Sequence, residues 1–181
     1  MSRMPILSRE DLSASQRAIH DAIVTGPRGE VPGPLGIWLS SPELAQRAQE
    51  LGAFCRYGTS LSPRLSELAI LVTASYWQAG YEWSVHSVEA EKAGLAADVL
   101  LDLKASREPR FAQDDERAVY DFARQLLVDH LVSDAAYARA VAALGEAGVV
   151  ELTGILGYYG LISMTIKAFN VPIPAGEVEP F

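Results

Sequence analysis

An uncharged segment in the middle of the chain constrains its fold more than any other feature. From Leu68 to Gly80 there is no Lys, Arg, Asp or Glu, so this segment provides apolar surroundings for its neighbours. It follows Ser62-Pro63, which is typical of a helix N-terminus with a capping serine and a proline at the first helical position. The pattern predicts a helix that begins at Ser62-Pro63, runs to about Trp77 and stops before a break at Gly80.

The other parts of the chain also favour helices. Alternation of β-branched residues is scarce, and no Asn-Gly or Asp-Gly hairpin signal separates alternating runs. Further helices are expected over about 13–24, 41–57, 81–93, 95–105, 114–129, 133–144 and 146–169. The sequence therefore predicts an all-α protein.

Two segments lie outside these helices. Gly26–Gly36 contains four glycines and three prolines, so we expect a loop there rather than core. This loop is placed to fold over a pocket, with Ile37-Trp38 docking its far end. Near the other end of the chain, Val171–Pro174 contains two prolines. It is expected to be extended and to wrap over the body or over a neighbouring subunit.

The last expected helix carries glycine at every third position along part of its length. These residues are Gly154, Gly157 and Gly160. Small residues on one face of a helix allow another backbone to approach closely. We therefore expect tight packing of a neighbouring helix against this face.

The length is that of one domain of ordinary size. A chain of 181 residues and 19.6 kDa is long enough to bury a substantial core. We expect a single domain over 1–181, with its core at about 41–170, an N-terminal helix and Gly/Pro loop within 1–40, and an extended tail over 171–181. No apolar run reaches the roughly 20 residues needed to cross a bilayer, and the N-terminus lacks the apolar core of a signal peptide. These features predict a cytoplasmic protein with no membrane partner.

Charge and cysteine content restrict the possible partners and chemistry. The formal net charge is −8, and an acidic chain without a basic stripe is a poor ligand for phosphate backbones, so no nucleic acid partner is expected. An anionic substrate would need specific arginines to overcome this field. Cys55 is the only cysteine, which excludes an intrachain disulfide and a Cys-x-x-Cys motif. We expect it to be a small buried apolar residue rather than a reactive thiol.

The candidate chemistry lies just after the uncharged segment. Glu82 and His86 are four residues apart and therefore share one face of a helix. If the helices over 63–77 and 81–93 form an antiparallel pair, Glu67 and His86 are offset by roughly 7 Å along the pair. Two flexible side chains can span that offset directly or through a water. We expect the three titratable groups to converge where the two helices meet.

Such a trio is suited to moving a proton. Histidine switches most readily between donor and acceptor near neutrality, and a neighbouring carboxylate fixes its tautomer and raises its basicity. The alternative is that Glu82 and His86 form an ordinary surface pair on a solvated helix face. Glu89 shares this face, but the spacing is not that of a known metal motif and no second histidine is placed nearby. No metal and no cofactor are expected.

At these residues the chain resembles the carboxymuconolactone decarboxylase family, which shares its fold with the alkylhydroperoxidase AhpD. The resemblance covers most of the chain. The matching residues are Leu65–Leu71, Trp77, Tyr81-Glu82-Trp83, His86, Ala90, Ala93-Gly94-Leu95, Tyr120–Ala123 and the stretch Tyr158–Asn170.

The resemblance implies an AhpD-like helical bundle that assembles as a homo-oligomer, a trimer or a hexamer, with its active site near subunit contacts. The family includes decarboxylases of γ-carboxymuconolactone in aromatic-acid breakdown and thiol peroxidases of the AhpD type. The two cysteine positions of the peroxidases correspond here to Ala79 and Glu82. Peroxide reduction by that route needs one thiolate to attack and a second thiol to resolve the sulfenic acid. The chain is therefore not expected to be an AhpD-type disulfide peroxidase.

The function predicted from these observations is that of a cofactor-free lyase or isomerase acting on a small organic acid or lactone. His86 is the expected proton donor or acceptor, oriented by Glu82, with Glu67 as relay. Two other classes remain open. One is a non-catalytic, oligomeric protein that binds a small molecule. The other is a peroxidase that uses Cys55 with an external thiol.

Substrate-binding residues are expected among one cation and several aromatic side chains. Arg64, one turn before Glu67, is the candidate for holding a substrate carboxylate, and Arg56 is a second candidate. The aromatic candidates for substrate contact, which are alternatively core or interface residues, are Tyr81, Trp83 and Trp38.

Overall fold

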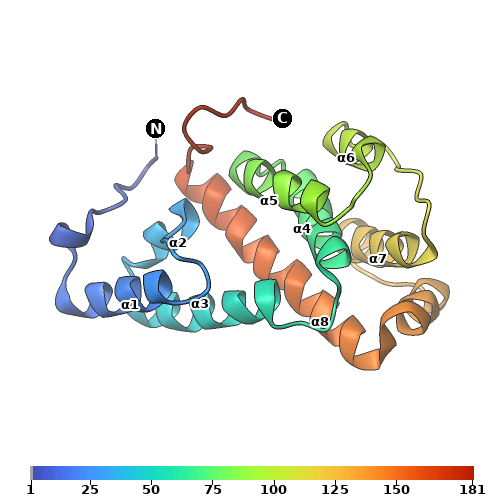
Figure 1. Cartoon of the computed structure of the whole chain (residues 1–181), viewed down its shortest axis with the longest axis horizontal. Coiled ribbons are helices and arrows are strands. Elements are labelled where there is room, and N and C mark those ends of the chain that lie inside the picture. Colours follow the sequence, from blue (N-terminus) through green and yellow to red (C-terminus); the bar gives the residue numbers. More distant parts are fainter. Residues whose placement is uncertain (1) are drawn as a thin grey trace.

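A computed structural model, which describes residues 2–181, shows an all-α single domain (Figure 1). No strand occurs within 2–181, so the predicted fold class is confirmed. The elements are η1 (Arg9–Asp11), α1 (Ala14–Thr25), α2 (Gly33–Trp38), α3 (Pro42–Tyr57), α4 (Pro63–Trp77), α5 (Gly80–Lys92), α6 (Ala97–Lys104), α7 (Asp114–Arg124), the π-helical turn η2 (Gln125–Asp129) and α8 (Asp134–Phe169).

Helix α4 lies in the core of the domain. Every residue from Leu65 to Ala74 is buried, and the helix packs against α5, α7 and α8. A helix that is apolar on all sides is stable only when its neighbours enclose it. Its start is fixed as expected, since the Ser62 hydroxyl accepts a hydrogen bond from the backbone N–H of Leu65. Any charged group on α4 is therefore forced into the interior.

Helix α8 runs through the middle of the molecule (Figure 1) and packs against α4, α7 and α3. It is interrupted at Gly145, whose φ of 73° is left-handed, so the two helices expected over 133–144 and 146–169 meet at a kink. By length and composition alone α8 is apolar enough to span a membrane, contrary to the expectation that no such run exists. Its packing against three helices is that of a core helix in a globular domain.

The expected packing against the glycines of α8 is not found within residues 2–181. A Cβ atom built on Gly154, Gly157 or Gly160 would meet no other atom within 4 Å. Val150 and Met164, one turn before and after this stretch, are 72% and 46% exposed. The face formed by these five residues, called here the α8 glycine face, is uncovered in the single chain.

The chain before α3 differs from expectation in two respects, because the end of the expected loop is helical and its Leu35 belongs to the core. Helix α2 begins at Gly33, inside the segment expected to be loop, because Pro34 sits in its first turn, where a missing N–H costs no hydrogen bond. Ile37 and Trp38 are both 4% exposed and anchor the far end of the loop, as predicted. Ser41 is the N-cap of α3 but makes no capping hydrogen bond with its side chain.

The turn between α4 and α5 is also made differently from the expected break at Gly80. The left-handed residue is Gln78, with φ 49° and ψ 44°, and Gly80 is already the first residue of α5. Gly80 is needed for another reason, since a Cβ there would lie 2.4 Å from a carboxylate oxygen of Glu179 and 3.1 Å from Ile173. The glycine allows the C-terminal tail to pass close to α5.

The tail folds back over its own domain (Figure 1). The ring of Phe181 packs edge-on against Trp83 of α5, with centroids 5.3 Å apart. Of the two surfaces expected for the tail, the structure therefore shows the chain's own body. This contact holds the end of the tail against α5, the helix that carries Glu82 and His86.

Candidate functional site

Glu67, Glu82 and His86 converge inside the domain. His86 Nδ1 lies 2.6 Å from Glu67 Oε2, and His86 Nε2 lies 2.9 Å from Glu82 Oε1. The three side chains are only 3%, 11% and 7% exposed for His86, Glu67 and Glu82, respectively. The expected convergence is confirmed, and a solvated surface pair is excluded.

The helices place these groups in a simple way. Glu67 belongs to the first half of α4, while Glu82 and His86 are one turn apart on α5. The turn at Gln78 brings the two helices together in antiparallel orientation, so the carboxylate of α4 meets the ring from the side opposite to Glu82. The imidazole is held at both nitrogens by groups from two different helices.

The carboxylates decide the protonation state of His86. Burial disfavours the imidazolium and lowers its pKa, but the charge of Glu82 and the hydrogen bonds with Glu67 and Glu82 outweigh burial and raise the pKa to about 9. The ring is therefore protonated at neutral pH and donates at both nitrogens. Tyr159 packs edge-on against the imidazole, with centroids 5.1 Å apart, and shields it from water.

A small cavity of about 120 Å³ lies beside this trio. Glu82 and His86 form part of its wall, whereas Glu67 does not. Other wall residues are Arg28, Glu30, Arg56, Tyr81, Tyr158 and Tyr159. Glu67 therefore lies on the interior side of the imidazole, at Nδ1. Glu82 contacts Nε2, the other ring nitrogen, and reaches the cavity together with His86.

The loop over 26–32 and the start of α2 close this cavity from one side, as the sequence predicted. Arg28, Glu30, Pro32 and Pro34 from this segment all lie on the wall. The hydroxyl of Tyr81 accepts a hydrogen bond of 3.1 Å from the backbone N–H of Gly33, which ties α2 to α5.

Three of the expected substrate-binding residues lie away from the cavity wall. The guanidinium of Arg64 is bound to Asp115 at 2.8 Å and to Glu116, because the start of α7 presents two acids to the start of α4. Trp83 contacts the tail through Phe181. Trp38 donates from its indole nitrogen to Thr165 at 2.9 Å. Arg64 therefore links α4 to α7 and does not contribute to the cavity wall.

The remaining expected residues are on the wall, and sequence reasoning missed several others. Tyr81 and Arg56, the second arginine candidate, both line the cavity. The missed residues are Arg28, Tyr158 and Tyr159. The signal for Arg28 was present, since it is a cation within the glycine- and proline-rich loop expected to cover a pocket. The two tyrosines follow the apolar pattern of α8, and no local signal distinguishes them from core residues.

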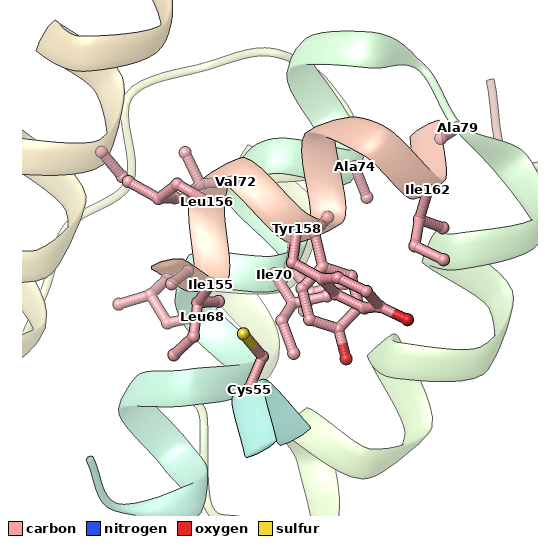
Figure 2. Close-up of a cluster of buried hydrophobic side chains, with 14 of the residues drawn as sticks. Cys55, Leu68, Ile70, Val72, Ala74, Ala79, Ile155, Leu156, Tyr158 and Ile162 are labelled. Carbon is pink, nitrogen blue, oxygen red and sulfur yellow. The ribbon is translucent and has the colours of Figure 1, made fainter. Parts of the chain in front are cut away.

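Cys55 lies in the apolar core. It is 1% exposed, and its sulfur points into the cluster that contains Leu68 and Ile155 (Figure 2). Burial raises the pKa of its thiol, which leaves less of the reactive thiolate. Cys55 does not belong to the cavity wall. Its environment is that of the small buried apolar residue expected from the sequence.

The carboxylates of the trio flank one imidazole instead of converging on a common point. Within residues 2–181 no group of three or more His, Cys, Asp or Glu side chains is arranged to hold a metal ion. The site as it stands is a protonated imidazole between two carboxylates.

The fold and this site define an all-α protein with a buried carboxylate–histidine–carboxylate cluster beside a small, partly polar cavity. Residues 42–125, which contain the whole cluster, match the carboxymuconolactone decarboxylase family. The match covers 84 of the 181 residues and relates this part of the chain to the family, while the likeness to AhpD-like structures concerns the fold. No curated protein sequence matches the chain.

Solved structures share the fold over nearly the whole chain. An uncharacterized peroxidase-related protein from Ralstonia eutropha JMP134, described as an alkylhydroperoxidase AhpD core, is 15% identical, with a TM-score of 0.78 over 96% of this chain and 93% of that chain. A peroxidase-related protein from Silicibacter sp. TM1040 is 14% identical, with a TM-score of 0.75 over 96% and 92%. The debrominase Bmp8, in complex with 2,3,4-tribromopyrrole, is 17% identical, with a TM-score of 0.74 over 96% and 91%. At these identities the likeness concerns the fold.

Proposed function

We propose that the protein is a cofactor-free lyase or isomerase that moves a proton on a small carboxylic acid or lactone. One observation carries the proposal, namely that Glu82 and a protonated His86 form part of the wall of a small, partly open cavity. Acid and base groups held within hydrogen-bond reach of a bound molecule are what proton transfer to or from carbon requires.

The geometry suggests that Glu67 and Glu82 exchange the roles expected from the sequence. Glu67 contacts Nδ1 from behind and orients the ring, so it is the positioning group. Glu82 and His86 share a proton across 2.9 Å and both belong to the cavity wall. Glu82 exchanges the proton with the substrate, and His86 returns or removes it. The pair can therefore act as an acid, by giving up the His86 proton through Glu82, or as a base, by taking a substrate proton on the Glu82 carboxylate.

Decarboxylation is the lyase reaction to which the family name points. When the carboxylate of a substrate leaves as CO₂, the electron pair of the broken C–C bond moves into the conjugated carbonyl of the lactone. The resulting enolate then takes a proton at carbon: His86 passes its proton to the Glu82 carboxylate, Glu82 delivers it to the carbon, and the imidazole regains a proton from solvent. An isomerase would use the same pair, with removal of one proton and delivery at another carbon.

The test is direct incubation with γ-carboxymuconolactone and related lactones while absorbance and CO₂ are recorded. Wild-type protein should turn over at least one of them, and Glu82→Gln and His86→Gln should each lower the rate by about 10²- to 10⁴-fold, the usual contribution of a general acid or base. Glu89→Gln is the matched control, because Glu89 is on the same helix but pairs with Lys92 at the surface. Equal turnover in all four proteins would contradict the proposal.

A non-catalytic protein that binds a small molecule is the second candidate, because a cavity closed by a loop also suits ligand retention. Ligand-dependent thermal stabilisation in the absence of any turnover would favour it. A peroxidase that depends on Cys55 is disfavoured by the burial of that thiol outside the cavity wall. Dithiol-dependent peroxide consumption that is lost in Cys55→Ser would support it.

We further propose that the protein is soluble and cytoplasmic and associates with copies of itself, as a trimer or hexamer. The α8 glycine face supports this, because an uncovered apolar face on the central helix would be buried by another copy. A strictly monomeric species at micromolar concentration would contradict it.

A further inference from the structure

Two arginines face the cavity without a carboxylate partner. Arg28, from the loop before α2, and Arg56, from the last turn of α3, both lie on the wall. Among residues 2–181 neither forms an ion pair with an acidic side chain. Glu30 also lies on the wall, but it is not within ion-pair distance of either guanidinium. The cavity therefore offers two cations that the protein itself does not neutralise.

Arg28 is held in place by neutral contacts only. Its Nη2 donates to the hydroxyl of Tyr158 at a long 3.5 Å, and its Nε is buried with no hydrogen-bond partner in the protein. A buried donor on a charged group is costly when it is left unsatisfied. Arg56 lies over the ring of Tyr57, with its central carbon 5.3 Å from the ring centroid, which leaves its N–H groups available.

The surrounding residues make room for this arrangement. A Cβ on Gly52 would lie 2.0 Å from the Tyr158 hydroxyl and 2.7 Å from Arg28 Nη2. Gly52 therefore allows both groups to approach α3. Because burial raises the pKa of Tyr158 to about 12, that tyrosine stays neutral and cannot serve as the counter-ion.

We propose that Arg28 and Arg56 together bind a carboxylate of the substrate, and that Arg28 is the residue that makes this chain select acids over neutral lactones. Guanidinium groups recognise carboxylates through paired, charge-assisted hydrogen bonds, which are stronger than neutral ones. A bound carboxylate would supply an acceptor for Arg28 Nε. Arg28 lies outside residues 42–125, so this selectivity belongs to the N-terminal segment and not to the part shared with the family.

This assignment rests on the proposed function, since it places the bound acid beside Glu82 and His86. The small volume of about 120 Å³, well below that of a drug-sized pocket, limits the ligand to a few carbon atoms beyond the carboxylate. A five-membered lactone that carries one carboxylate fits this description.

Binding of a matched pair of lactones tests the assignment independently of catalysis. The probes are 5-oxotetrahydrofuran-2-carboxylate and γ-valerolactone, in which a methyl group replaces the carboxylate. Calorimetry or NMR titration of the full chain should show at least tenfold tighter binding of the carboxylate. Arg28→Gln and Arg56→Gln should each weaken binding of the carboxylate by about tenfold or more and leave binding of γ-valerolactone within about twofold.

Control variants distinguish a specific loss of the arginine contacts from a general change in charge or a loss of folding. Arg124→Gln is the matched control, because this exposed arginine lines a different groove, and its affinities should equal those of the wild type. Arg28→Lys keeps the charge and should bind with intermediate affinity, which a loss of folding would not produce. Unchanged circular dichroism and thermal midpoints would confirm that the variants fold.

The outcomes are distinguishable from failure of the proposed function. Equal affinity of the wild type for both lactones, retained selectivity in Arg28→Gln, or no binding of the carboxylate at about 10 mM, where even a millimolar Kd would be visible, would overturn the assignment. Selective binding without turnover of any lactone would instead leave the two arginines assigned and refute the proposed reaction.

Discussion

His86 and Glu67 lie 19 residues apart in the sequence and on different helices, and their Nδ1 and Oε2 atoms are 2.6 Å apart in the buried core. This contact fixes one nitrogen of the ring. The other nitrogen is consequently directed at Glu82, which lies on the cavity wall. A carboxylate on the central buried helix thus determines which group of α5 can exchange protons with a ligand.

Replacing Glu67 by Gln tests this dependence. The amide keeps the size of the side chain but removes its charge, so the pKa of His86 should fall from its raised value toward neutrality. Turnover should fall by about 10- to 100-fold, as is usual when a group that orients a functional imidazole is changed. NMR titration of the imidazole signals gives the pKa, and Glu91→Gln, at an exposed position of α5, should alter neither quantity. An unchanged His86 pKa in Glu67→Gln would show that the contact has no electrostatic role.

The raised pKa of His86 also predicts how stability depends on pH. Because its pKa rises from an ordinary value of 6.5 to about 9 on folding, the folded protein binds the proton more tightly than the unfolded chain does. The stabilising contribution is therefore fully present below about pH 6.5 and is lost as the pH rises through about 9.

Urea denaturation at intervals between these two pH values checks the prediction. The free energy of unfolding of the wild type should decrease across the interval, and the decrease should be smaller in His86→Gln. His130→Asn alters an exposed histidine in a left-handed turn and should keep the pH dependence of the wild type. A free energy of unfolding with the same pH dependence in wild type and His86→Gln would refute the assigned protonation state.

Gly52 is expected to be intolerant of any side chain. The added methyl group of Gly52→Ala would lie 2.0 Å from the Tyr158 hydroxyl and 2.7 Å from Arg28 Nη2, which is too close for either contact, so the neighbours must move. We expect a loss of about 1–3 kcal/mol in the free energy of unfolding, typical of overpacking, and weaker carboxylate binding. Glu50→Ala is the control, because Glu50 is exposed on the same helix and surface substitutions usually change the free energy of unfolding little. Equal thermal midpoints for the two variants would contradict the packing seen at Gly52.

Local sequence signals predicted most of the fold, because its helix ends are marked by residues with a direct effect on the backbone. Ser62 caps α4 as expected, Ser133 caps α8 at the start of the helix expected over 133–144, and Gly94, with φ 92°, follows α5. The left-handed turn at Gln78 was not predicted, since glutamine has no preference for that conformation. Tertiary contacts impose it there.

The site was predictable only as far as helix geometry reaches. The one-turn spacing of Glu82 and His86 and the antiparallel pairing with Glu67 follow from helical periodicity. Arg64 was misplaced because its partners, Asp115 and Glu116, are about fifty residues away in the sequence. A local sequence pattern cannot predict an ion pair between residues so far apart, and it cannot predict which arginine faces the cavity.

The α8 glycine face provides a test of self-association. Gly157→Leu would place a bulky side chain in the middle of this face, where the single chain has open space, so the monomer should fold normally while association weakens. Analytical ultracentrifugation at micromolar concentration should show the wild type as an oligomer and the variant shifted toward monomer. Ala138→Leu, at an exposed position of α8 before the kink, is the control. An oligomer of unchanged mass in Gly157→Leu would exclude this face as the contact.

Deuterium incorporation from D₂O is the most direct measurement of proton transfer at the Glu67–His86–Glu82 cluster, because it reports exchange at carbon even where no net product forms. The wild type, incubated with 5-oxotetrahydrofuran-2-carboxylate or γ-carboxymuconolactone, should incorporate deuterium at carbon next to the lactone carbonyl of substrate or product. Glu82→Gln and His86→Gln should lose about 10²- to 10⁴-fold of that rate. Deuterium incorporation in both variants at the wild-type rate would contradict the assignment of this cluster to proton transfer. Incorporation by the wild type no faster than in buffer alone would contradict it as well.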